Sequence, residues 1–282
     1  MCVIWGIPYL MIRVAVREFS PALLVLIRTA VAAGILLPVA AARGELRRVV
    51  RYWRPLLLFT AVEIALPWLM LARAEQDISS SLAGLLIAAV PLVGATTVAL
   101  TGGDERLGGR RLAGLLIGVV GVAAIVGLDV GNVDAAPLLE IAIVVVCYAL
   151  GPIILARTLA DAPALGVVAS SLALAAIPYV PAAFFDVPDS LPAGRVLASV
   201  AGLAVLCTAL AFIVFFALIA EVGPVRATVI TYVNPAVAAV LGVALLNESF
   251  TAGMAVGFAL VLVGSVLATA RVRAPAAEVA PA

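Results

Sequence analysis

AGLLIAAVPLVGA, residues 83–95, returns later in the chain as ATVITYVNPAVAA, residues 227–239. The two stretches align without a gap and place Pro91 on Pro235. Both are apolar and long enough to form the middle of a membrane helix. The repetition therefore indicates that one helical unit is used twice.

The match extends in both directions. ERLGGRRLAGLLIGVVG (105–121) aligns with ESFTAGMAVGFALVLVG (248–264), and at nearly the same offset GIPYLMIR (6–13) falls on LGPIILAR (150–157). Self-similarity over this length indicates a duplicated structural unit.

The composition is that of an integral membrane protein. Of the 282 residues, 65% are hydrophobic and 12% charged, with a mean hydropathy of +1.26, whereas soluble domains have about 25% charged residues. The net charge of +1 gives no basic surface for nucleic acid, so no nucleic-acid partner is expected. There is no His, and the three Cys are isolated, so neither a metal site nor a cofactor is predicted.

A bilayer core needs about 20 apolar residues per helix, and cutting the chain at clusters of charge, Pro and Gly gives ten spans. Their predicted ranges are 1–17, 21–42, 54–74, 79–100, 110–128, 136–157, 163–185, 194–219, 224–246 and 251–271.

Each repeat holds five spans, and because five is odd the second copy enters from the opposite side. The predicted fold is an all-α integral membrane protein with ten transmembrane helices arranged as two inverted five-helix repeats. The first repeat covers 1–130 and the second 131–273, followed by a disordered cytoplasmic tail, 274–282. The alignment also places the start of the first span before residue 1, so we expect a shortened N-terminus.

Orientation follows from arginine. Most of the 17 basic residues fall on the side that holds the loop after the second span, and this side includes both termini. The predicted location is a cell membrane, multi-pass, with both termini in the cytoplasm. All basic residues are Arg, and Ala is abundant, which favours a bacterial origin.

At these residues the sequence resembles the EamA family of the drug/metabolite transporter superfamily. The resemblance rests on an early WG, a Pro and Arg around the second span, and a block A...P...ExL...G...G that closes each half. These residues are Trp5, Gly6, Pro21, Arg28, then Ala83, Pro91, Glu105, Leu107, Gly114, Gly121, and again Ala227, Pro235, Glu248, Phe250, Gly257, Gly264. Phe250 departs from the usual Leu. The resemblance implies a ten-helix transporter that exports or exchanges small organic metabolites.

Two ionisable residues lie deep within predicted spans. A charge at a helix centre costs roughly 2.5 to 3.5 kcal/mol on insertion scales, so such residues are functional candidates. Glu63 and Arg28 lie about 14 Å and about 10 Å from opposite surfaces at 1.5 Å per residue, and we expect them to face one cavity. They form either a static ion pair or a substrate or proton site, in which case Glu63 provides proton coupling. Trp68, about 140° around an α-helix from Glu63, is expected to face another surface.

Aromatic and amide side chains from three other spans complete the predicted substrate site. They are Trp5, Tyr9, Tyr148, Tyr232 and Asn234. Pro235 follows Asn234 and frees a backbone carbonyl, which is useful where a helix lines a cavity. The alternative for each aromatic residue is interfacial anchoring or packing against lipid.

Two pairs of glycines have the GxxxG spacing that lets helices approach closely, Gly114 with Gly118 and Gly253 with Gly257. They pack within the chain or form a homodimer contact. Glu105 and Glu248 stand at loop edges, where capping of the fifth and tenth spans is expected.

The repeat and the buried charges favour a secondary carrier that works by alternating access on a small-molecule metabolite. A membrane-embedded lipid-modifying enzyme, a non-transporting scaffold and a channel are the alternatives. The enzyme is disfavoured because the chain lacks His and has no paired carboxylates within a helix. No nucleotide-binding GxxxxGK[ST] loop occurs.

Overall fold

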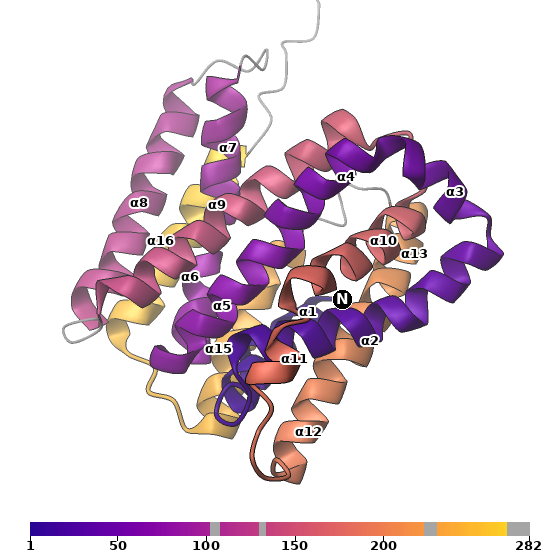
Figure 1. The fold of residues 1–282 in the computed structure, drawn as a ribbon. Coiled ribbons are helices and arrows are strands. Elements are labelled where there is room, and N and C mark those ends of the chain that lie inside the picture. The colour runs from indigo at the N-terminus through magenta and orange to yellow at the C-terminus, as the bar shows by residue number, and fades with distance from the viewer. Residues whose placement is uncertain (102–107, 130–133, 223–229, 270–282) are drawn as a thin grey trace, which may run out of the picture.

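The computed structural model describes residues 1–101, 108–129, 134–222 and 230–269, and all regular structure in these ranges is helical (Figure 1). The first half contains α1 (Cys2–Ala15), α2 (Pro21–Ala42), α3 (Glu45–Val49), η1 (Val50–Tyr52), α4 (Trp53–Phe59), η2 (Thr60–Ala65), α5 (Leu66–Asp77), α6 (Ser80–Ile87), α7 (Val90–Leu100) and α8 (Gly109–Asp129). The second contains α9 (Ala135–Thr158), α10 (Ala164–Ala176), η3 (Ile177–Tyr179), α11 (Ala182–Phe185), α12 (Gly194–Ala201), η4 (Gly202–Leu210), α13 (Ala211–Val222), α15 (Ile230–Leu246) and α16 (Ala252–Thr269).

Seven helical stretches in the described residues are long and apolar enough to cross a membrane, and three apolar helices are shorter. Each of the ten predicted ranges overlaps one of these helices. The all-helical class is confirmed, while the inverted repeat stays a prediction. The tail 274–282 and the junction at 130–133 lie outside the described residues.

The third predicted span begins earlier than expected. Residues 43–54 were expected to form an arginine-rich loop, but the chain is helical without interruption from Glu45 to Asp77. Gly44 adopts a left-handed conformation with φ 67°, which turns the chain after α2 at little steric cost. Pro55 cannot donate to the carbonyl of Arg51, and the short 3-10 turn η1 lies directly before this point.

Two long helices pack through glycine. α8 and α16 lie side by side in Figure 1, and a Cβ added at Gly121 would lie 2.7 Å from the carbonyl oxygen of Gly257. A Cβ at Gly264 would likewise lie 2.6 Å from the carbonyl oxygen of Gly114. The glycines therefore serve packing within the chain, and a homodimer through the Gly-rich helices stays a prediction.

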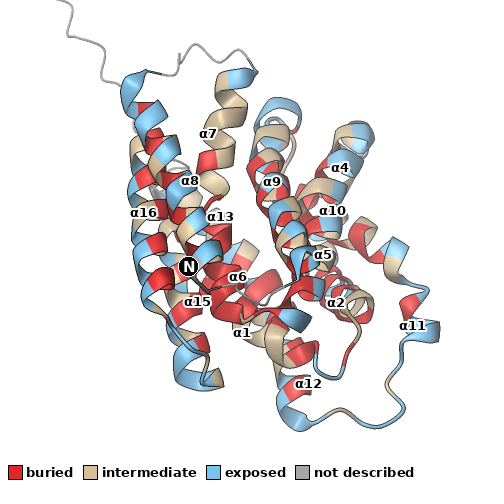
Figure 2. Ribbon diagram, turned by 90° about the vertical axis from the view of Figure 1, so that its left-hand side faces the viewer, coloured by how far each residue is buried: buried red, intermediate tan, exposed pale blue. Residues whose placement is uncertain are grey.

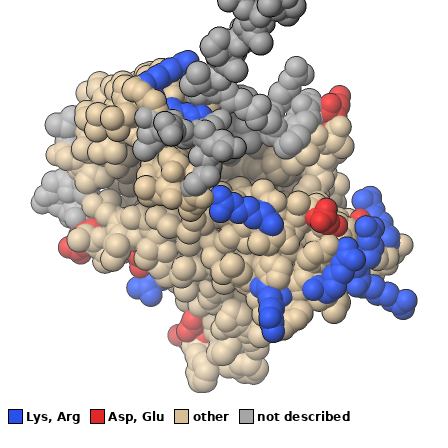
Figure 3. Space-filling view, turned by 90° about the horizontal axis from the view of Figure 1, so that it is seen from above, with Lys and Arg blue, Asp and Glu red and all other residues tan. Residues whose placement is uncertain are grey.

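The outer surface of the bundle is apolar. Figure 2 shows buried positions on the helix faces turned inward and exposed positions on the outer faces. Many exposed side chains are large and hydrophobic, including Leu116, Val119, Phe184 and Phe185. Seen from above, charged side chains are sparse and gather mainly at one edge (Figure 3). This distribution suits a lipid environment around the helices.

Candidate functional site

A string of ionisable side chains runs through the otherwise apolar interior. Tyr148 on α9 lies within electrostatic range of both Glu63 and Arg28, and Tyr9 on α1 within range of Arg28 and Glu75. Glu63 belongs to η2, Arg28 to α2 and Glu75 to α5. Five helical segments, four from the first half of the chain and α9 from the second, therefore contribute polar side chains to this string.

Arg28 is the cation of this string. It is 7% exposed, its Nε donates to the Thr208 hydroxyl of η4 at 2.9 Å, and its guanidinium carbon lies 3.6 Å from the centre of a Trp68 ring. A desolvated cation over an indole is stabilised by about 2 kcal/mol. The helices thus fix the guanidinium from two sides before any ligand binds.

The ion pair between Glu63 and Arg28, one of the two alternatives drawn from the sequence, is not formed by the described residues. In the described part of the chain, the one ion pair with an N–O distance within 4.0 Å joins Arg73 to Glu140, at 2.7 Å. Arg28 instead contacts Trp68, the residue expected to face another surface. Glu63 and Trp68 meet different helices, since Glu63 faces α9 and Trp68 faces Arg28 of α2.

Glu63 faces α9. Its Oε2 is buried and has no hydrogen-bond partner, and a Cβ added at Gly151 would collide with this oxygen. Gly151 is therefore the position at which α9 makes room for the carboxyl group. Tyr148, one helical turn earlier on α9, is close enough to interact electrostatically with both Glu63 and Arg28.

The helix containing Glu63 turns π-helical for a local reason. Pro67 has no N–H and its ring crowds the carbonyl four residues earlier, which is that of Glu63. Tyr179 then donates its hydroxyl to the carbonyl oxygen of Ala65 at 2.8 Å. Backbone groups freed inside a membrane helix need such partners.

The second π-helical segment, η4, also reaches the string. The Thr208 hydroxyl that accepts from Arg28 donates in turn to the carbonyl of Leu203, five residues earlier, at 2.7 Å. At the offset that places Pro91 on Pro235, Glu63 of the first π-helix aligns with Cys207 of the second. π-Helical turns are frequent at functional sites.

Glu75 is a site residue that the sequence analysis missed. Its exposed fraction is 0%, and neither carboxyl oxygen has a hydrogen-bond partner. Arg13 instead donates to the backbone carbonyls of Glu75 and Gln76, which end α5. Glu75 follows directly after the predicted span 54–74, so it was assigned to a loop, although an acidic residue one position beyond an apolar run is a readable signal.

Glu248 corrects a second expectation. It was assigned to cap the tenth span, but Thr251 accepts from Met254 N at 3.1 Å and caps α16. The Glu248 carboxylate accepts from the backbone N–H of Ser80 and of Ser81, each at 2.9 Å, and thereby caps α6 in the other half. Its partner in the repeat, Glu105, lies outside the described residues.

Three predicted site residues lie away from the string. Trp5 packs against Phe212 and Phe215 of α13, with ring centres 5.9 and 4.7 Å away. The Tyr232 hydroxyl pairs with Thr269 of α16 at 3.0 Å. Asn234, with its amide nitrogen directed at α1, donates to the carbonyl of Cys2 at 3.0 Å. These side chains join helices to one another.

The string presents several polar groups in the protein interior. The described residues contain no group of three or more His, Cys, Asp or Glu that could hold a metal ion. They do offer one oriented guanidinium, two phenol hydroxyls and two carboxyl groups, of which Glu63 and Glu75 lack partners. Such groups bind complementary charges strongly because little water competes with them.

Comparison with known proteins gives two positive findings. The family model described as "EamA-like transporter family" matches residues 1–127 and 136–270. A solved structure described only as "Crystal structure of protein" is similar with a TM-score of 0.69 and 21% sequence identity, over 95% of this chain and 94% of the other. No curated protein matches the chain significantly.

Proposed function

Because the chain belongs to the EamA-like transporter family, we propose that it is a secondary transporter of small organic metabolites and that its substrate binds at the interior polar string. The observation that carries this proposal is the pair of partnerless interior carboxyl groups, of which Glu75 interacts electrostatically with the oriented guanidinium of Arg28 and Glu63 with Tyr148. Intramembrane ionisable groups without a structural partner are typical of substrate and ion pathways.

The transport cycle that fits this site is alternating access. All ten helices cross the membrane, with the halves 1–130 and 131–273 inverted and both termini in the cytoplasm. The described structure supports a closed state, because Tyr9, Arg28 and Glu75 are all buried. Substrate then enters when the halves move apart on one side. Export or exchange is the direction that the family favours.

The charges of the site favour amines. Arg28 already has an aromatic and a hydroxyl partner, whereas the two carboxyl groups have none. A buried carboxylate needs a positive partner or a proton, since an unpaired charge in a low-dielectric interior costs several kcal/mol. Cationic or zwitterionic amines supply that positive charge, and exchange of the amine for a proton at Glu63 would couple transport to pH.

The test is thermal stabilisation of purified protein by amino acids, organic cations, nucleosides and sugars at two pH values, for wild type and Glu63→Gln. Tyr232→Phe, on the α15 face directed at α16, is the matched control. We expect an amine to raise the unfolding temperature of wild type and control but not of the Gln variant.

The same variants reconstituted into vesicles then test transport of the stabilising amine. Equal stabilisation of wild type and Glu63→Gln would remove Glu63 from the binding site. Stabilisation without any counterflow across the vesicle membrane would contradict the transporter function itself.

A further inference from the structure

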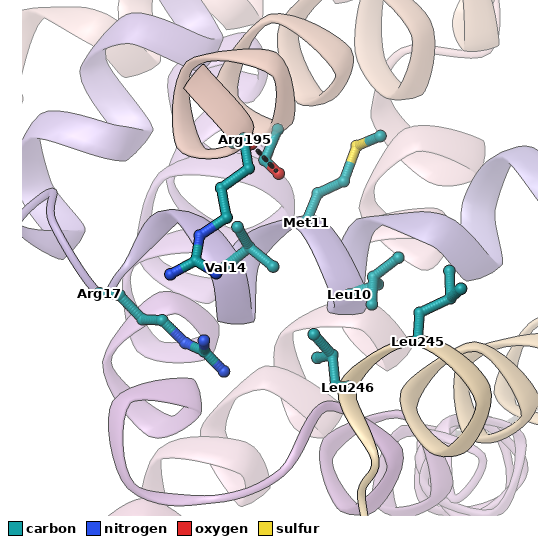
Figure 4. A pocket seen from close by; sticks show the side chains of 8 residues that line it. Leu10, Met11, Val14, Arg17, Arg195, Leu245 and Leu246 are labelled. Atoms are coloured by element: carbon teal, nitrogen blue, oxygen red, sulfur yellow. Dashed lines mark hydrogen bonds between the residues drawn. The ribbon is translucent and has the colours of Figure 1, made fainter. Parts of the chain in front are cut away.

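A groove on the surface of the bundle combines an apolar wall with two arginines. It has a volume of about 280 Å³ and is bordered by α1, α12 and the end of α15. Leu10 and Val14 of α1 and Leu245 and Leu246 of α15 line it, and Arg17 and Arg195 complete it. In Figure 4 both guanidinium groups lie on one side of the groove and the three leucines on the other.

The two arginines have no structural task. In the described residues neither side chain makes a hydrogen bond, an ion pair or a ring contact. Two nearby carboxylates are engaged elsewhere, because Glu18 accepts from the backbone N–H of Ala193 at 2.7 Å and Asp186 from the Ser20 hydroxyl at 2.7 Å. The two positive charges are thus available to an anion.

The groove lies where helices end. Arg17 follows the last turn of α1, Arg195 belongs to the first turn of α12, and Leu246 is the last residue of α15. In a multi-pass membrane protein such helix ends lie at the level of the lipid headgroups, where arginine side chains extend toward the polar layer. The apolar part of the groove then faces the acyl chains.

We propose that this groove binds one anionic phospholipid, with its phosphate between Arg17 and Arg195 and the upper part of an acyl chain along the leucines. A phosphate diester accepts charge-assisted hydrogen bonds from two guanidinium groups. A soluble anion would leave the apolar wall of the groove uncovered, whereas a phospholipid also supplies an acyl chain that covers it. The lipid would join α1 of the first half to α12 and α15 of the second.

Native mass spectrometry of the full chain tests the proposal by titration with phosphatidylglycerol or with phosphatidylcholine of the same acyl chains. Each arginine near an anionic lipid contributes about a fivefold gain in affinity. We therefore expect Arg17→Gln/Arg195→Gln to weaken phosphatidylglycerol binding about 25-fold. The effect on phosphatidylcholine, which has no net charge, is expected to be much smaller.

The matched control is Arg47→Gln/Arg48→Gln, which removes the same charge from two exposed arginines of α3. We expect it to bind phosphatidylglycerol as wild type does. Three results would each overturn the proposal: equal binding of both lipids by wild type, an equal loss in the control, or complete displacement of the lipid by glycerol 3-phosphate. Binding is measured without transport, so the outcome is independent of the proposed function.

Discussion

Replacing Glu248 by Gln tests whether this residue holds the two halves together as the cap of α6. Its carboxylate accepts from the backbone N–H of Ser80 and Ser81, and both serines are fully buried. Gln retains one oxygen, so one of the two N–H groups loses its carboxylate acceptor. An unsatisfied buried donor costs about 1 to 3 kcal/mol, and the lost charge at the helix N-terminus adds about 0.3 to 1 kcal/mol.

Glu75→Gln is the matched control, because it makes the same chemical change in a neighbouring carboxyl group that has no hydrogen-bond partner. It removes no hydrogen bond, so we expect a change within about 1 kcal/mol or a gain in stability. Glu248→Gln is expected to destabilise the protein by about 1.3 to 4 kcal/mol.

The assay uses the protein's own cysteines. Cys147 and Cys207 are free and buried, so a thiol-reactive fluorogenic dye reports their exposure as the protein unfolds in detergent on heating. Glu248→Gln should unfold at a clearly lower temperature than wild type and Glu75→Gln should not. If both variants unfold together, or if Glu248→Gln unfolds with wild type, the capping role is wrong.

Three further changes test the packing around the site by the same assay. Gly121→Ala should lower the free energy of unfolding by about 1 to 3 kcal/mol relative to Gly127→Ala. Of these two added Cβ atoms, only the one at position 121 meets the backbone of α16. Equal unfolding temperatures of the two variants would contradict this contact. Gly151→Ala should lower the free energy of unfolding by about 1 to 3 kcal/mol, because the added Cβ collides with the Glu63 side chain. Adding Glu63→Ala to this variant should restore part of the loss. If the effects of the two substitutions simply add in the double variant, the contact is refuted. Arg28→Lys should lower the free energy of unfolding by about 1 to 2 kcal/mol, because lysine lacks the planar group that stacks on Trp68 and the Nε that donates to Thr208. A stability equal to that of wild type would show that neither contact stabilises the protein.

The positions of the helices could be predicted because long apolar runs are the strongest signal in a membrane sequence. The EamA resemblance was confirmed by the family match. Arg28, Tyr9, Tyr148 and Glu63 could be selected from the sequence because polar residues in apolar runs are conspicuous, and their role in substrate binding stays a prediction. Trp5 was selected by the same criterion and instead packs on α13, since residue type alone does not say which face of a helix meets the interior.

Other features depend on contacts that no local pattern contains. A π-helical turn differs from an α-helix by one residue in its hydrogen bonding, and the α-helical periodicity assumed for residues 60–65 does not contain that difference. Glu248 caps a helix that begins 168 residues earlier in the chain, although a carboxylate beside a helix start suggests a cap of that helix. In both cases the local pattern was compatible with several arrangements, and tertiary packing selected one.

The two π-helical segments share a backbone feature but differ in their side chains. They fall at matching positions of the sequence repeat, yet the first carries Glu63 where the second carries Cys207, and only the second supplies a hydroxyl to Arg28. The π-helical turn thus occurs in both segments, while the acidic group occurs only in the first. The proposed site therefore has a carboxyl group on one side and the Thr208 hydroxyl on the other, an asymmetry that favours one orientation of the cationic substrate that we propose.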